Sequence, residues 1–218
     1  MNDLAIYGMG GFGREVACLV NYINENEPTW NLIGFFDDGK LIGESCEYGE
    51  VLGGIKELNN WSKPLNVAIS IGKPTTLKNL VVSINNPLIE YPNIIAPDIC
   101  WYDRNTVSLG KGNIISRECQ YSCNVKIGDF NIFNYRVSVG HDTTLGNNNS
   151  FMTETKIAGN VIMGNLNYCG VNSVIIQGVM IGNNTTIAAG SVVMRRTKDG
   201  YTYIGIPANA WIMTKKTE

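Results

Sequence analysis

Residues 109–193 read, in blocks of six, LGKGNI ISRECQ YSCNVK IGDFNI FNYRVS VGHDTT LGNNNS FMTETK IAGNVI MGNLNY CGVNSV IIQGVM IGNNTT IAAGSV and V. The first position of all fifteen blocks is apolar or aromatic. Because an α-helix does not repeat at six residues and a plain strand alternates at two, this period predicts a stacked solenoid of short strands. An all-β sandwich with evenly spaced turns is the alternative, but its strands would not keep one phase over so many repeats.

A second period shows how many blocks close one coil. Glycine follows the apolar position at 110, 128, 146, 164 and 182, an interval of 18 residues. Three blocks therefore form one coil with three flat faces. The fifth position of each block is mostly small or β-branched, with asparagine at 113, 131, 149 and 167, which suits an inward-facing corner. Since the phase never slips, we expect regular coils without an inserted loop.

The first 90 residues follow a different pattern, in which strands alternate with helices. Short apolar runs at 4–7 and 32–36 flank apolar residues at helical spacing over 12–24, which predicts one βαβ unit. Another run at 67–71 precedes Pro74, a residue that favours the first turn of a helix. We therefore predict a Rossmann-like, three-layer α/β domain at residues 1–90, and a coil domain with a C-terminal tail at residues 91–218.

Composition excludes several classes of function. The chain has 218 residues, 44% of them hydrophobic, and 17 Lys and Arg against 19 Asp and Glu, so its formal net charge is -2. This charge balance gives no sign of a basic surface for nucleic acid, and no apolar run is long enough for a membrane-spanning helix. The six cysteines form no C-x-x-C pair and are expected to be free thiols, and a single histidine argues against a metal site. We expect a cytoplasmic protein that neither binds nucleic acid nor enters a membrane.

A glycine-rich loop lies between the first predicted strand and the first predicted helix. Gly8, Gly10 and Gly13 have the G-x-G-x-x-G spacing, in the context where backbone N–H groups can approach a phosphate. Asp37 and Asp38, at the end of the second strand, could accept hydrogen bonds from a ribose or a base. The simpler alternative is a tight βα turn without a ligand. Nicotinamide dinucleotides are disfavoured because they need two such halves, whereas about 90 residues fit one nucleotide.

The only histidine, His141, occupies the third position of its block, where side chains point away from the interior of the coil. Its expected neighbours one coil away are Cys123 and Gly159. An imidazole can remove a proton from an attacking amine or hydroxyl at neutral pH, and an adjacent carboxylate, here Asp142, can hold the ring. Because neighbouring side chains on a strand diverge, this pairing requires a corner conformation at Asp142.

Three segments outside the repeat add a resemblance to a known family: GMGGFGREV at residues 8–16, GFFDD at residues 34–38 and GIPA at residues 205–208. The chain resembles the hexapeptide-repeat acyltransferases, whose coil is a left-handed parallel β-helix. Within them it is similar to a branch that contains bacterial nucleotide-sugar N-acetyltransferases, such as that of bacillosamine synthesis, and the sialic acid O-acetyltransferases. The resemblance covers nearly the whole chain.

The resemblance implies roles for individual residues. His141 would be the general base and Asp142 its partner, while the first domain would hold the nucleotide of a sugar diphosphate. The implied substrate-binding residues are Gly8, Gly10, Gly11, Gly13, Asp37, Asp38, Gly72, Lys73 and Asn134. Coenzyme A would lie in a groove between adjacent subunits of a homotrimer, lined by Ser150, Gly159, Val171, Ala189 and Gly190, with a backbone N–H near Gly159 for the oxyanion. Ser150 stands where some relatives have a second histidine.

Three hypotheses about function follow. The first is an acetyl-CoA-dependent N-acetyltransferase that acts on a UDP- or dTDP-linked 4-amino-dideoxy sugar. The second is O-acetylation of a sialic acid or a related sugar. The third is a solenoid without catalytic activity that binds sugars or serves as a scaffold. No metal is required by any of them.

Overall fold

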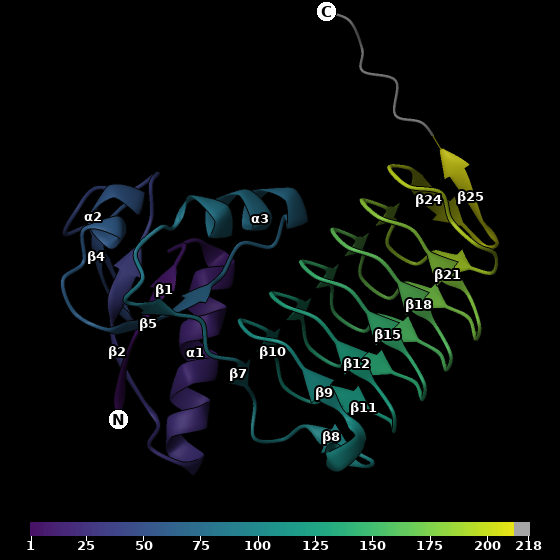
Figure 1. Ribbon diagram of the computed structural model, residues 1–218, viewed down its shortest axis with the longest axis horizontal. Helices are drawn as coiled ribbons and strands as arrows, with labels where there is room; N and C mark the ends of the chain where they lie inside the picture. The colour runs from purple at the N-terminus through teal and green to yellow at the C-terminus, as the bar shows by residue number, and fades with distance from the viewer. Residues whose placement is uncertain (212–218) are drawn as a thin grey trace, which may run out of the picture.

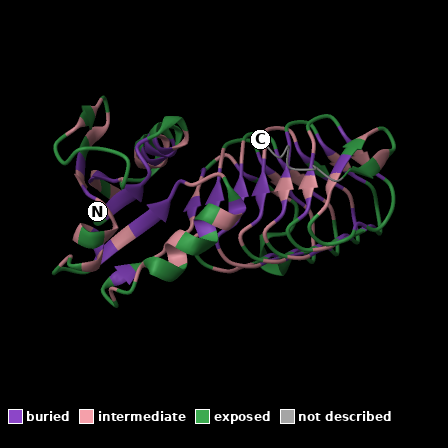
Figure 2. Cartoon of the chain, turned by 90° about the horizontal axis from the view of Figure 1, so that it is seen from above, coloured by how far each residue is buried: buried purple, intermediate pink, exposed green. Residues whose placement is uncertain are grey.

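The computed structural model describes residues 1–211, so the predicted C-terminal tail from residue 212 onward lies outside the described residues. The chain forms two lobes (Figure 1): an α/β lobe at the N-terminal end and a stack of triangular coils. Buried residues run through the sheet of the first lobe and along the inside of the coils, while the outer turns of the coils are exposed (Figure 2). Both lobes therefore have an apolar interior.

The first lobe contains one six-stranded sheet in the order β3-β4-β2-β1-β5-β6. The strands are β1 (Asn2–Tyr7), β2 (Trp30–Phe36), β3 (Ser45–Cys46), β4 (Gly49–Gly53), β5 (Leu65–Ile69) and β6 (Ile89–Glu90), and the helices are α1 (Gly11–Asn26), α2 (Ile55–Asn59) and α3 (Pro74–Ser83). All strand pairs are parallel except β3 with β4. The predicted βαβ unit and the helix that begins at Pro74 are confirmed, whereas the β3–β4 hairpin and α2 were not expected.

The sheet is covered on both faces, as the apolar pattern predicts. Val16 and Val20 of α1 pack with Ile6 in one core cluster, and Leu77 of α3 and Leu58 of α2 pack with the opposite face in another. These two clusters define the three layers. Each cluster also contains residues of the coil lobe, so the two lobes share their cores.

The second lobe is a parallel β-helix with three faces. The first face contains β7 (Ile94–Ile95), β10 (Ile114–Ile115), β13 (Ile132–Phe133), β16 (Ser150–Phe151), β19 (Tyr168–Cys169), β22 (Thr186–Ile187), β24 (Thr202–Gly205) and β25 (Ala208–Trp211). The second contains β8 (Cys100–Trp101), β11 (Gln120–Tyr121), β14 (Ser138–Val139), β17 (Lys156–Ile157), β20 (Val174–Ile175) and β23 (Val192–Val193). The third contains β9 (Ser108–Leu109), β12 (Lys126–Ile127), β15 (Thr144–Leu145), β18 (Ile162–Met163) and β21 (Met180–Ile181). We call the turns from first to second face, second to third and third to first the first, second and third corners.

The register reproduces the period of 18 residues over the stretch that the sequence singled out. Ile132 pairs with Ser150, for example, and Ser150 with Tyr168. The ends of the stack depart from this period: Ile94 pairs with Ile114, and Thr186 with Thr202. The first coil is longer because a 3-10 turn over 104–106 is inserted between β8 and β9, which explains why the block pattern begins at 109 and not earlier.

Each corner needs one residue with positive φ. The fourth position of the block supplies it, mostly with asparagine or glycine, as at Asn124 (φ 55°) and Gly178 (φ 75°). Asparagine and aspartate tolerate this left-handed conformation better than most residues because their short polar side chains bond locally. Asp142, with φ 57°, is one of them, so the expected corner conformation next to His141 is confirmed.

A ladder of buried asparagines runs through the third corner. Asn149 donates from its backbone N–H and its Nδ2 to Oδ1 of Asn131, at 2.9 and 3.0 Å, and its own Oδ1 accepts the N–H of Asn167 at 2.9 Å. Outside it runs a second ladder through the exposed Asn147, whose Oδ1 accepts the N–H of Asp129. The sequence marked the buried asparagines only as exceptions to the small-residue pattern.

We predict that Asn149→Ala lowers the melting temperature more than Asn147→Ala. The buried change leaves the Asn167 N–H without an acceptor in a region that water does not reach, which costs about 2–3 kcal/mol and roughly 4–12 °C for a chain of this size. Water can replace the hydrogen bonds of the exposed Asn147 side chain, so Asn147→Ala is expected to lower the free energy of unfolding by at most about 1 kcal/mol. Differential scanning fluorimetry of both variants checks this, and equal shifts would show that burial of the ladder does not matter.

Candidate active site

The glycine loop between β1 and α1 uses its glycines in different ways. Gly8 has φ 106°, which few other residues adopt, and a methyl group at Gly13 would overlap the carbonyl oxygen of Gly8. Gly10 and Gly11 instead face open space, since a methyl group at either would meet no atom within 4 Å. Two glycines therefore make the turn and the close helix contact, while the other two leave the first N–H groups of α1 open to a ligand.

A cavity of about 430 Å³ lies at the carboxyl ends of the strands beside this loop. It is lined by Tyr7, Gly8, Asp37, Asp38, Gly39, Ile71, Thr76, Asn79, Leu80 and Ser83. We call it the nucleotide cavity. β2 and β5 flank β1, so the chain crosses from one side of β1 to the other at this point. Ligands of open α/β sheets bind at such a switch point.

Both aspartates at the rim of the nucleotide cavity hold the local backbone. Asp37 Oδ2 accepts the N–H of Met9 at 2.8 Å, and its Oδ1 accepts the N–H of Gly39 at 2.8 Å. Asp38 Oδ2 accepts the Tyr7 hydroxyl at 2.6 Å. Burial, followed by this bond to Asp38, raises the pKa of Tyr7 well above its usual range, so the phenol stays protonated. Each carboxylate oxygen keeps a lone pair for a further donor.

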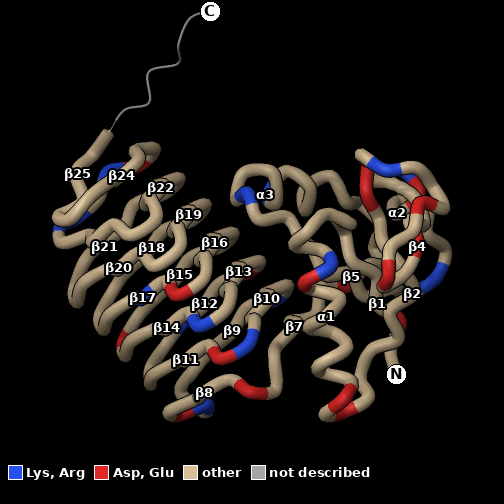
Figure 3. The backbone as a smooth tube through the Cα atoms, turned by 180° about the vertical axis from the view of Figure 1, so that it is seen from behind, with Lys and Arg blue, Asp and Glu red and all other residues tan. Residues whose placement is uncertain are grey.

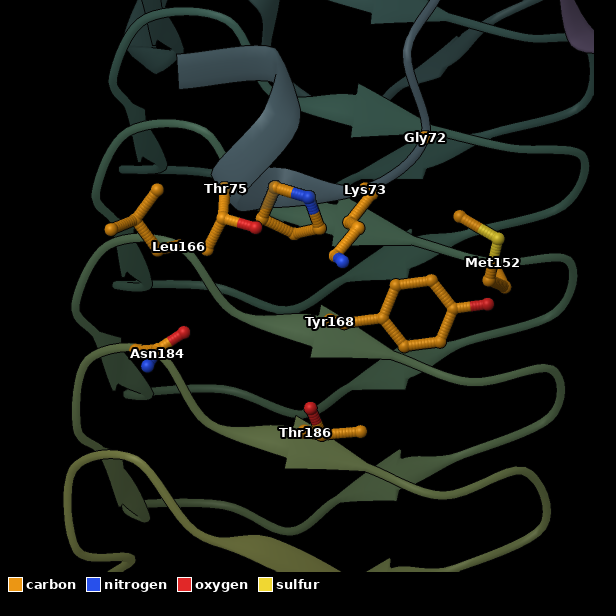
Figure 4. A pocket seen from close by; sticks show the side chains of 9 residues that line it. Gly72, Lys73, Thr75, Met152, Leu166, Tyr168, Asn184 and Thr186 are labelled. Atoms are coloured by element: carbon orange, nitrogen blue, oxygen red, sulfur yellow. The ribbon is translucent and has the colours of Figure 1, made fainter. Parts of the chain in front are cut away.

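Gly72 and Lys73 line a different opening, which we call the inter-lobe cleft. It has about 390 Å³ and lies between the start of α3 and the first face of the coils, lined by Gly72, Lys73, Pro74, Thr75, Met152, Leu166, Tyr168, Asn184 and Thr186. Figure 4 shows the side chain of Lys73 extending from its loop towards the ring of Tyr168. The structure thus brings Gly8, Asp37 and Asp38 together but places Lys73 at a neighbouring cleft.

His141 lies at the second corner and points out of the coil. Its Nδ1 is 2.7 Å from Asp142 Oδ2, and both side chains are about half exposed. Hydrogen bonds from His141, first, and from Asn124 lower the pKa of Asp142 below its usual value, so the carboxylate is ionised at neutral pH. Because an ionised carboxylate only accepts, Nδ1 of the neutral ring carries the proton and Nε2 offers its lone pair.

Gly159, one coil further along the same corner, lies directly beneath this ring. A methyl group there would be 2.5 Å from His141 Nε2 and 2.7 Å from Cε1, so any residue other than glycine would displace the ring. The backbone pairs the two residues as well, because the N–H of Asn160 donates to the His141 carbonyl at 2.7 Å. The N–H of Gly159 itself has no acceptor among residues 1–211 and is free to bind a developing oxyanion.

The remaining predicted residues lie elsewhere on the coil. Asn134 is at the first corner, where its Oδ1 accepts the N–H of Tyr135, and it lines a cavity of about 380 Å³ between α1 and the coil. Val171, Ala189 and Gly190 also lie at the first corner and are exposed. Ser150 is on the first face, fully buried, and its hydroxyl lacks a partner among the described residues. Within one chain, His141 and Gly159 therefore share the second corner, and none of these five residues lies there.

Sequence reasoning missed two residues that support the site. Asn124 Nδ2 donates to Asp142 Oδ1 at 3.1 Å, and the interval of 18 residues between them would have revealed this contact. Ser70, which is buried, donates its hydroxyl to the carbonyls of Tyr7 and Gly8 and thereby supports the glycine loop. No sequence pattern links Ser70 to that loop, because their contact depends on how β5 pairs with β1.

No group of three or more His, Cys, Asp and Glu side chains within residues 1–211 is arranged to hold a metal ion. None of the helices in that part of the chain is long and apolar enough to cross a membrane.

Comparison with known proteins identifies the first lobe. Residues 3–84 match the family model of the PglD N-terminal domain. The first lobe is similar to the PglD N-terminal domain over these residues. Its glycine loop, β2 and the two aspartates that follow β2 lie inside the match, as do the residues that line the nucleotide cavity. No curated protein sequence matches the chain significantly.

Solved structures share the fold of both lobes. The acetyltransferase domain of PglB from Neisseria gonorrhoeae is 23% identical, with a TM-score of 0.87 over 97% of this chain and 100% of that chain. PerB from Caulobacter crescentus, solved in complex with CoA and GDP-perosamine, is 24% identical, with a TM-score of 0.87 over 97% of this chain and 98% of that chain. WeeI from Acinetobacter baumannii is 25% identical, with a TM-score of 0.85 over 97% and 100%.

These matches confirm the fold predicted from the sequence. The chain has an α/β N-terminal domain followed by a left-handed parallel β-helix, and its fold matches that of the PglB domain. The resemblance to the nucleotide-sugar acetyltransferase branch is confirmed by the similarity to the PglD N-terminal domain and by the shared fold.

Proposed function

We propose that this protein is an acetyltransferase that moves an acetyl group from acetyl-CoA to the amino group of a nucleotide-linked 4-amino-dideoxy sugar. The observation that carries the proposal is the His141–Asp142 pair over the free N–H of Gly159, in a chain whose first lobe is similar to the PglD N-terminal domain. Solved structures of the same fold include a perosamine N-acetyltransferase in complex with CoA and GDP-perosamine, which supports the donor and the acceptor class.

The geometry at the second corner suits acetyl transfer. An attacking amine forms a bond to the thioester carbon and loses a proton to His141 Nε2, while Asp142 stabilises the resulting imidazolium through Nδ1. The N–H of Gly159 stabilises the oxyanion. When the C–S bond breaks, the thiolate of coenzyme A takes up the proton from Nε2, which restores the neutral ring. No other group in the described residues is needed for this sequence of steps.

The first lobe supplies a place for the nucleotide. Gly10 and Gly11 leave open space at the start of α1, where a diphosphate could approach the first N–H groups of the helix, and Asp37 and Asp38 have lone pairs for ribose or base. The inter-lobe cleft with Lys73 adjoins the nucleotide cavity, since Ile71 lines one and Gly72 the other. A sugar attached to the diphosphate would extend towards this cleft.

The proposed site requires more than one copy of the chain. The inter-lobe cleft lies against the first face of the coil, whereas His141 projects from the second corner. A homotrimer in which the second corner of one copy approaches the first face of the next would bring His141 to the cleft. In that arrangement Val171, Ala189 and Gly190 of the first corner and Gly159 of the second would line one groove for coenzyme A, whereas the fully buried Ser150 would not contact it.

Mass spectrometry of reaction products tests the proposal. We expect the purified protein with acetyl-CoA to add one acetyl group to a UDP-, dTDP- or GDP-linked 4-amino sugar, and the product to resist mild alkali as an amide does. An alkali-labile ester on sialic acid or a sugar hydroxyl would instead support O-acetylation. If no nucleotide sugar in the panel is acetylated and CoA produces no thermal shift, the protein is a binding or scaffold solenoid.

A further inference from the structure

The His141–Asp142 pair is tied to the neighbouring coil by one further side chain, that of Asn124. Asn124 lies one coil before Asp142 at the same corner position, because β11 and β14 pair in the register of 18 residues. Its Nδ2 donates to Asp142 Oδ1 at 3.1 Å, whereas Asp142 Oδ2 is 2.7 Å from His141 Nδ1. The two oxygens of one carboxylate therefore have different partners, and together these fix the plane in which the carboxylate meets the ring.

The carboxylate of Asp142 has no other hydrogen-bond partner or cation within residues 1–211. Its side chain and that of His141 are about half exposed, so packing alone does not hold them. Lysine and arginine are sparse along the coils (Figure 3), and none has a side-chain nitrogen within 4.0 Å of Asp142 in this part of the chain. The orientation of Asp142, and through it that of the imidazole, therefore depends on Asn124.

This side-chain contact is not a general property of the corner. Asn160 lies one coil beyond Asp142 and has the same left-handed conformation, with φ 56°. Its backbone N–H donates to the His141 carbonyl, but its side chain makes no hydrogen bond among the described residues. The left-handed corner accounts for asparagine at both positions, but only Asn124 also binds a carboxylate.

Asn124 is itself anchored by the 3-10 turn over 104–106 that is inserted before β9. In the regular second corners, the N–H of the left-handed residue donates to a carbonyl of the previous coil, as that of Asp142 does to Cys123 at 3.0 Å. The N–H of Asn124 donates instead to Thr106 Oγ1 at 2.9 Å, and this hydroxyl donates to the Asp103 carbonyl at 3.0 Å. A hydroxyl of the inserted turn thus replaces the carbonyl of a regular coil, and connected hydrogen bonds lead from the turn to the imidazole.

We propose that Asn124 is a positioning residue for the general base and that Thr106 anchors it. This inference rests on the proposed function, because it assigns both residues a part in the reaction of His141. A carboxylate with both oxygens bonded holds an imidazole in one tautomer and one orientation. Asn124 and Thr106 are exposed, so water can replace their hydrogen bonds at little cost in stability, and their loss should affect turnover and not folding.

Steady-state kinetics of matched variants tests the inference. We expect Asn124→Ala to lower kcat about tenfold, as loss of a residue that orients a functional histidine commonly does, with little change in KM for acetyl-CoA. Thr106→Val keeps the shape of the side chain but not its hydroxyl and should lower kcat less, whereas Thr106→Ser keeps the hydroxyl and should retain wild-type kcat. The control is Asn148→Ala at the third corner, where φ is also 55°, so that it has the same backbone strain but should leave kcat unchanged.

Combining Asn124→Ala with Asp142→Asn shows whether Asn124 acts through the carboxylate. We expect the double variant to lose about as much kcat as Asp142→Asn alone, because the group that Asn124 orients is already absent. Additive losses, or wild-type kcat in Asn124→Ala, would overturn the inference while acetyl transfer that depends on His141 keeps the proposed function. Wild-type kcat in Thr106→Val would remove the 3-10 turn from this role. If His141→Ala turns over at the wild-type rate, the proposed mechanism fails and the inference with it.

Discussion

Replacing His141 with alanine is expected to lower the rate of acetyl transfer by about 10²–10⁴-fold, the usual contribution of a general base. Nε2 is the atom that would receive the proton of the amine, because Asp142 holds Nδ1 at 2.7 Å. The loss should appear in kcat with little change in KM for acetyl-CoA, since removal of the ring takes away no contact that the donor makes at the phosphate end. Steady-state kinetics with the best acceptor from the panel measures both constants.

A folding defect can be separated from a catalytic one in this variant. The side chain of His141 is 49% exposed, and its contact with Asp142 is at the surface, so the melting temperature should stay within a few degrees of the wild type. The matched control is Asp142→Asn, which keeps the corner conformation but loses the ionised carboxylate. We expect it to lower kcat less than His141→Ala does. Unchanged turnover in His141→Ala would exclude His141 as the base.

Much of the coil could be predicted because its information is local and repeated. An apolar residue in every sixth position determines which side chains point inward, so the outward position of His141 follows from counting. The corner at Asp142 could also be anticipated, since the pairing with His141 needs it and aspartate tolerates φ 57°. The first and last coils could not be predicted, because a change of coil length there breaks the phase.

The position of Lys73 could not be predicted for a different reason. Its loop follows β5, and the resemblance grouped it with Asp37 among the substrate-binding residues. Whether it faces the nucleotide cavity or the coil depends on how the lobes pack, which is decided by a buried cluster that contains both Leu77 of α3 and Ile132 of the coil. These contacts join residues far apart in the chain, and no periodic pattern encodes them.

The second large effect that we expect is from Gly159→Ala. The added methyl group would lie 2.5 Å from His141 Nε2, so the ring must swing away from the position in which Asp142 holds it. The backbone does not oppose the change, because Gly159 is not among the residues with positive φ, and the free N–H is retained. We therefore expect kcat to fall by about 10–100-fold, as misplacement of a catalytic group by about 1 Å can do, while the protein remains folded.

A double-mutant cycle shows whether Gly159→Ala acts through the imidazole. In the His141→Ala background there is no ring to displace, so adding Gly159→Ala should cause little further loss, and the two effects should be strongly non-additive. Gly178→Ala serves as the control in the next coil of the same corner, where a methyl group meets no atom within 4 Å, although φ of 75° makes it mildly destabilising. Fully additive losses would mean that the methyl group obstructs the donor and does not displace the ring of His141. Gly159 would then be needed to admit the thioester and not to position the base.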